Sequence, residues 1–135
     1  MDDALLIAAG SLALLGAAIH GLAGEVLVVR KLAPGALPPT RFGGPGATRT
    51  MIHVTWHITT VAFLSVGFGL LLSGTVLHGD TARGISVLAA AASTGFAAIA
   101  VVLGAGSLPS PRSLLRHPGP IVLSATAVLA WLGAL

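Results

Sequence analysis

Two histidines four residues apart, His53 and His57, lie near the start of an apolar run from residue 51 to residue 77. On an α-helix, side chains at positions i and i+4 share one face, so both imidazoles can bind the same metal ion. The run contains no formally charged side chain and is long enough to span a bilayer, which takes about 20 apolar residues. Polar side chains are costly in such a segment and tend to be functional. The pair therefore indicates a histidine site within a membrane helix.

A second apolar run, from residue 4 to residue 29, is interrupted only by His20 and Glu25. At about 1.5 Å per helical residue, His20 lies about 15 Å before Arg30, and His57 lies about 12 Å beyond Arg49. These similar depths predict that the two imidazoles lie at one level on neighbouring antiparallel helices. With about 100° per residue, Glu25 lies about 140° around the helix from His20, so we expect it to reach the site only from its edge.

One chemistry that suits these residues is axial ligation of a b-type haem between the two helices. His20 and either His53 or His57 would be the axial ligands, a standard haem arrangement. Small residues around His20 are expected to leave room for the porphyrin. Trp56 and Phe68 would flank the macrocycle, and Arg41 or Arg49 would meet the propionates near the membrane surface.

The other chemistry is a transition-metal site formed by His20, His53 and His57, with or without Glu25. Nitrogen-rich sites suit Fe, Cu and Zn, and the ligand types alone do not choose among these metals. A neighbouring hydroxyl such as that of Thr55 or Thr60 would accept a free ring N–H and fix the tautomer.

A purely structural interpretation also accounts for each histidine taken singly. An imidazole near the interface can bond a backbone carbonyl, a threonine or a lipid headgroup, and Trp56 would then belong to an aromatic belt. A buried imidazole such as that of His20 needs a polar partner. Only one acidic residue lies within a span, and no nucleotide-binding or nucleophile motif is present, so no catalytic residue is assigned.

Composition supports a membrane location. The chain is 55% hydrophobic and only 8% charged, against about 25% charged residues in soluble domains. The net charge of +3 comes from seven Lys and Arg residues against four Asp and Glu. Six of the seven lie in two connections, which makes nucleic acid an unsuitable partner. The chain has no cysteine, so thiolate metal sites and iron–sulfur clusters are excluded.

The fold predicted is an all-α, integral membrane four-helix bundle forming a single transmembrane domain over residues 1–135. Connections rich in Pro, Gly and Arg separate its first two and last two spans. Lys and Arg collect in cytoplasmic loops, and six of the seven fall in these connections, which predicts outside N- and C-termini in a bacterial-type inner membrane. The spans are expected at residues 4–29, 51–77, 83–103 and 118–135, with cytoplasmic linkers at 30–50 and 104–117.

The segments His20-Gly21-Leu22-Ala23-Gly24-Glu25 and Trp56-His57-Ile58-Thr59-Thr60 loosely resemble uncharacterised small bacterial membrane proteins of four predicted spans. The resemblance covers under a tenth of the chain and implies no activity or ligand. We therefore expect a small membrane protein that binds haem b or a transition metal ion, in electron transfer or metal handling. The alternative is a non-catalytic accessory or assembly subunit of a larger membrane complex. Lipid, further copies of the chain or other subunits are the expected partners.

Overall fold

The computed structural model describes residues 1–41, 43–107 and 117–135, and the regular structure of these residues is helical. An isolated β-bridge between Thr40 and Gly43 is the exception. The all-α class is thus confirmed. The elements in chain order are α1 (Asp3–Ala18), η1 (Ile19–Ala23), α2 (Gly24–Leu27), η2 (Val29–Lys31), η3 (Pro34–Ala36), α3 (Pro45–Thr75), α4 (Gly79–Ser107) and α6 (Pro118–Ala134).

Three helical segments among the described residues are long and apolar enough to cross a membrane. They are Asp3–Lys31, which joins α1 to η2, then Pro45–Thr75 and Gly79–Gly106. The apolar helix α6 has 17 residues and is shorter than these. At about 1.5 Å per residue, α3 is about 46 Å long, which exceeds the bilayer core of about 30 Å.

Helices α3 and α4 begin earlier than the sequence predicted. α3 starts at Pro45 rather than Met51, because proline fits the first turn of a helix, where its missing N–H costs nothing. α4 starts at Gly79, whose φ of +59° lies in the left-handed region that glycine adopts without strain. α4 also continues to Ser107. Residues 45–50 and 104–107, which were expected in linkers, are thus helical. The rest of the second linker, with Arg112 and Arg116, lies almost entirely outside the described residues.

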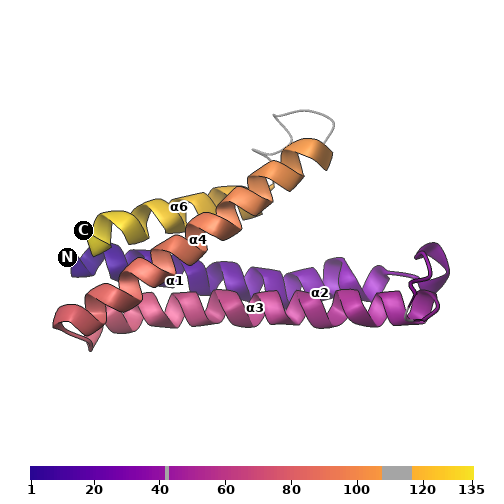
Figure 1. Ribbon diagram of the computed structural model, residues 1–135, viewed down its shortest axis with the longest axis horizontal. Helices are drawn as coiled ribbons and strands as arrows, with labels where there is room; N and C mark the ends of the chain where they lie inside the picture. The colour runs from indigo at the N-terminus through magenta and orange to yellow at the C-terminus, as the bar shows by residue number, and fades with distance from the viewer. Residues whose placement is uncertain (42, 108–116) are drawn as a thin grey trace. The chain divides into compact units, whose positions relative to one another are not determined.

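The chain divides into two compact units. The first comprises residues 1–16 and 64–135, and the second comprises residues 17–63. In the first unit α6 runs beside α4, and the two chain ends meet where the Asp2 N–H donates to the Gly133 carbonyl at 2.9 Å (Figure 1). The core of this unit consists of small and branched apolar side chains: Leu6, Ala9, Leu70, Ala89, Ala90 and Ala130. A single domain over the whole chain stays a prediction.

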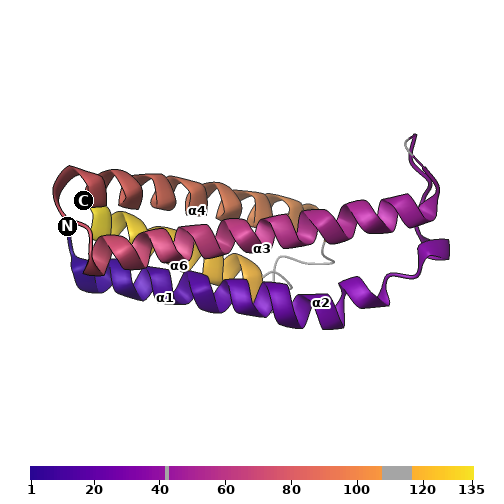
Figure 2. The ribbon, with the colours of Figure 1, turned by 90° about the horizontal axis from the view of Figure 1, so that it is seen from below.

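The second unit contains the four side chains singled out by sequence. It begins with the end of α1, continues through the short helices and the linker, and returns along the first half of α3 (Figure 2). Its helical turns near residues 20–25 lie against those near residues 56–60, because Gly21 faces Thr60 and Gly24 faces Trp56. The candidate site therefore lies within one unit.

Gly10 in the first unit should not tolerate a methyl group. A Cβ there would lie 2.8 Å from the Gly67 carbonyl oxygen and 2.8 Å from the Leu71 backbone nitrogen. Backbone atoms cannot yield as a side chain does, so Gly10→Ala should destabilise the protein. Overpacking costs about 1–3 kcal/mol, which exceeds the gain in helix propensity of up to about 1 kcal/mol. Gly95→Ala is the matched control, because no neighbouring atom of the described residues lies within 4 Å of its added Cβ.

Thermal unfolding in detergent compares the two variants. Gly10→Ala should unfold at a lower temperature than the wild type, and Gly95→Ala at an equal or higher one. Equal melting temperatures for both variants would contradict the close approach at Gly10.

Candidate metal centre

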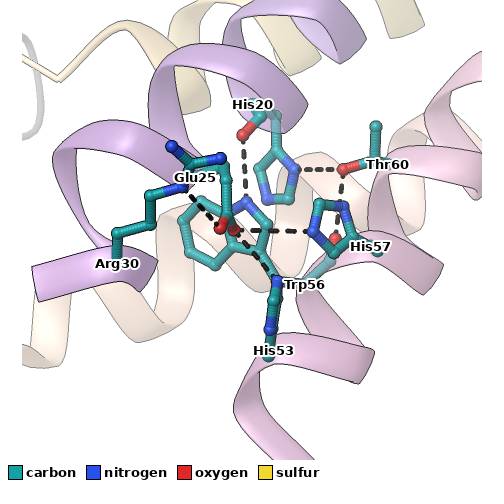
Figure 3. A network of polar contacts seen from close by, with 7 residues as sticks. All are labelled: His20, Glu25, Arg30, His53, Trp56, His57 and Thr60. Atoms are coloured by element: carbon teal, nitrogen blue, oxygen red, sulfur yellow. Dashed lines mark hydrogen bonds and ion pairs between the residues drawn. The ribbon is translucent and has the colours of Figure 1, made fainter. Parts of the chain in front are cut away.

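The Glu25 carboxylate on α2 faces both histidines of α3 (Figure 3). Its Oε2 atom lies 3.2 Å from His53 Nε2 and 3.5 Å from His57 Nε2. Its other oxygen, Oε1, accepts a hydrogen bond from Arg30 Nε at 3.2 Å. Each of Glu25, His53 and His57 offers one ligand atom, and the three atoms lie within 4.8 Å of one another. These three residues, the Glu25 triad, can hold a metal ion.

The carboxylate is more enclosed than its partners. The Glu25 side chain is 14% exposed, whereas those of His53 and His57 are 49% and 48% exposed. Oε2 is buried and has no hydrogen-bond partner among the described residues, although it lies near both ring nitrogens. A buried polar atom without a hydrogen bond requires an explanation, and a bound ion is one. The Arg30 bond to Oε1 leaves Oε2 available to such an ion.

A π-helical turn explains why Glu25 reaches the histidines. Residues 19–23 form the π-helix η1, in which the Gly24 N–H bonds to the Ile19 carbonyl, five residues back. A π-helix takes more residues per turn than an α-helix, so residues five apart come closer to one face. The sequence-based separation of about 140° between His20 and Glu25 assumed a regular α-helix and is wrong for this reason. Glu25 lies within the cluster rather than at its edge.

His20 faces α3 but lies outside the Glu25 triad. Its Nδ1 lies 3.0 Å from Thr60 Oγ1, and the Thr60 hydroxyl donates to the Trp56 carbonyl at 3.1 Å. Because a hydroxyl has a single proton, Nδ1 is the donor to Thr60 and Nε2 carries the lone pair. Of the two hydroxyls expected to accept a free ring N–H, Thr60 does so, whereas the Thr55 hydroxyl bonds within its own helix. Three of the four predicted metal ligands lie together, and the inclusion of His20 stays a prediction.

Aromatic side chains of α3 enclose the His20 ring. The Trp56 indole stacks on it with centroids 4.3 Å apart and planes 12° apart, and Phe63 meets it edge-on at 5.3 Å. The Trp56 Nε1–H also donates to the His20 carbonyl at 3.0 Å. Sequence reasoning missed Phe63, although its spacing of seven residues from Trp56 places the two on one helix face.

The space expected for a porphyrin beside His20 is filled by protein. A Cβ added to Gly24 would lie 2.4 Å from Trp56 Cζ2, and one added to Gly21 would lie 2.7 Å from Thr60 Cγ2. These glycines admit α3 side chains, so protein occupies the helix face at Gly21 and Gly24. The expectation of an open face around His20 is therefore not met.

Arg49, predicted to meet haem propionates, lies in the first turns of α3 rather than in a linker. Its Nε is buried and has no hydrogen-bond partner within the described part of the chain. The cation that pairs with Glu25 is Arg30 instead. The structure therefore does not bring Arg49 into the cluster.

No family model, curated protein or solved structure matches the chain. The geometry of the site is therefore the basis for any functional argument.

The two histidines are accessible from the outer side of α3. An open hollow of about 470 Å³ is lined by His53, His57 and the apolar side chains of Val54, Ile58 and Val61. The half-exposed imidazoles can therefore be reached by an ion without opening the helices. The surrounding wall is aliphatic, which limits hydration of the site on that side.

Proposed function

We propose that the protein is a small integral membrane protein that binds one transition-metal ion through Glu25, His53 and His57, in metal handling or electron transfer. The observation that carries this proposal is the position of Glu25 Oε2, which is buried and lies 3.2 and 3.5 Å from two imidazole Nε2 atoms. The sequence spacing of the two histidines and the π-helical turn before Glu25 supply this arrangement.

The ligand spacing suits a tetrahedral ion. With metal–ligand bonds of about 2.0–2.2 Å, neighbouring ligand atoms in a tetrahedral zinc site are about 3.3–3.6 Å apart. The distances from Glu25 Oε2 to the two imidazole Nε2 atoms, 3.2 and 3.5 Å, are close to this range. An ion would enter with small side-chain adjustments, and Arg30 would keep the carboxylate oriented through Oε1.

The donor set narrows the choice of metal. Two imidazoles and one carboxylate without sulfur suit zinc or iron(II), and both commonly keep open positions with such ligands. Copper binds imidazole as well and remains among the expected ions. A zinc ion would favour a role in metal handling, whereas iron or copper would supply redox chemistry for electron transfer. Haem b is disfavoured by the contacts that fill the space around His20.

Membrane insertion as four spans with both termini outside completes the proposal. Large apolar side chains far from the cores are well exposed, as expected for a surface that faces lipid; examples are Leu22, Leu88 and Val102. Arg30, Lys31, Arg41 and Arg49 would then lie at the cytoplasmic side of an inner membrane. Arg112 and Arg116, which follow α4 in the sequence, would lie on that same side if α3 and α4 both cross, and a crossing by α6 would return the C-terminus to the outside.

A second candidate is an accessory or assembly subunit. On α4, Gly84, Gly95 and Gly106 recur every eleven residues, which returns to nearly the same helix face, and no described atom lies within 4 Å of a Cβ added at any of them. Small residues on an open face let another membrane helix approach closely. This face suits a second copy of the chain or a subunit of a larger complex.

Metal analysis of the detergent-purified protein tests the proposal. After chelation, titration with Zn²⁺, Co²⁺ or Fe²⁺ should saturate at one ion per chain, and the absorption spectrum should contain no Soret band. A Soret band that disappears in His20→Ala and His57→Ala would establish haem instead. Neither metal nor Soret band, together with defined co-purifying subunits, would favour the accessory role.

A further inference from the structure

We propose that His20 and Trp56 form a clamp that positions Glu25 for metal binding, so that His20 is a positioning residue and not a ligand. The inference rests on the proposed metal site and concerns what fixes its geometry. The clamp consists of two polar bonds and a ring stack between the π-helical turn and α3. None of its members contributes an atom to the Glu25 triad.

The clamp acts on the turn that orients Glu25. In a regular α-helix the Gly24 N–H would bond to the His20 carbonyl, but in η1 it bonds to the Ile19 carbonyl. The His20 carbonyl accepts the Trp56 indole N–H. The Trp56 indole N–H thus replaces the Gly24 N–H as the donor to the His20 carbonyl. Loss of that donor favours a return toward regular helix, which would rotate Glu25 away from α3.

The same segment of α3 carries the clamp and the metal ligands. Trp56 precedes His57 directly, and Thr60 lies one turn further along. His20 lies five residues before Glu25 in the opposing segment. Because metal ligands must be held within about 0.5 Å of their productive positions, a contact that fixes α2 against this part of α3 also sets the affinity of the site.

Trp56→Phe tests the clamp, because it keeps an aromatic ring beside His20 and removes the donor. We expect the dissociation constant for Co²⁺ to rise about 10–100-fold, the usual effect of losing a group that orients a metal ligand. The visible Co²⁺ spectrum should also change, because the carboxylate leaves the coordination sphere. Trp131→Phe is the matched control: its indole N–H donates to Thr94 Oγ1 at 3.0 Å, in the other unit, and its loss should not change Co²⁺ affinity.

A double-mutant cycle with Glu25→Gln separates positioning from a general loss of structure. If Trp56 acts through the carboxylate, Glu25→Gln should weaken Co²⁺ binding far less in the Trp56→Phe background than in the wild type. Additive effects of the two substitutions would overturn the clamp. Thr60→Ser, which keeps the hydroxyl, should retain affinity better than Thr60→Val.

Amide hydrogen exchange of the metal-free protein provides a measurement independent of the ion. Trp56→Phe should speed exchange in peptides covering residues 19–25 and leave α6 unchanged. Unchanged exchange and unchanged Co²⁺ affinity would overturn the clamp alone. If Trp56→Phe speeds exchange but neither the wild type nor the variant binds a metal ion, the proposed function is overturned. The faster exchange would still support the clamp as what orients Glu25.

Discussion

Glu25→Gln should abolish high-affinity metal binding while leaving the metal-free protein about as stable as the wild type. The substitution keeps the size of the side chain and an oxygen that can accept from Arg30. It removes the charge on a group that is 14% exposed and lies between two imidazoles. Losing a group that only hydrogen-bonds to a metal ligand already costs about 10–100-fold in metal affinity. Loss of the anionic ligand itself should therefore cost at least about 100-fold.

The unfolding free energy of the metal-free protein should change little, because Glu25→Gln removes one small stabilising effect and one small destabilising effect. The ion pair with Arg30 involves a guanidinium side chain that is 68% exposed, and such pairs contribute about 0–1 kcal/mol. Neutralising Glu25 also removes the desolvation cost of an enclosed charge, which offsets that loss. The unfolding free energy without metal should consequently change by less than about 1 kcal/mol.

Calorimetric titration with Zn²⁺ and thermal unfolding of the chelated protein check the two halves of this prediction. His78→Ala is the control, since His78 lies exposed at the turn before α4 and has no place in the Glu25 triad. Wild-type zinc affinity in Glu25→Gln would show that the carboxylate is not a ligand. Global unfolding of the metal-free variant would instead assign Glu25 a structural role.

Part of the site follows from sequence spacing alone. His53 and His57 share a face because α3 is a regular α-helix throughout this region, so their spacing determined their geometry. The similar depths of His20 and His57 were also informative: His20 packs against Trp56 and Thr60, which flank His57 along α3. Helical class and the long apolar segments likewise follow from composition and the absence of breakers.

Sequence spacing admitted Glu25 only as an optional ligand at the edge of the site, because its reach depends on the π-helical turn. No residue between Ile19 and Ala23 is a proline or another unambiguous marker of such a turn. The turn coincides with contacts made by a segment more than 30 residues later, chiefly the Trp56 bond to the His20 carbonyl. Such tertiary contacts override a helical periodicity read from neighbouring residues.

The glycines near His20 illustrate a second limit. Gly21 and Gly24 predict a smooth helix face, but not what fills it. A haem and a tryptophan side chain both need such a face, and the structure places Trp56 and Thr60 there. The prediction of a haem there rested on the smooth face alone, which does not distinguish a cofactor from a side chain of the protein.

Loss of either histidine of α3 should weaken metal binding strongly, because each imidazole contributes one of the three ligand atoms. Losing a group that only orients a metal ligand already costs about 10–100-fold in affinity. Losing a ligand itself should therefore cost at least about 100-fold.

Single-histidine variants distinguish ligands from a positioning residue. His53→Ala and His57→Ala should lose similar amounts of affinity, because both Nε2 atoms lie at similar distances from the Glu25 carboxylate. His20→Ala should lose less, about 10–100-fold, because its imidazole positions Glu25 without contributing a ligand atom. Competition titrations with a chelator measure the three affinities. A loss in His20→Ala as large as that in His53→Ala would return His20 to the ligand set.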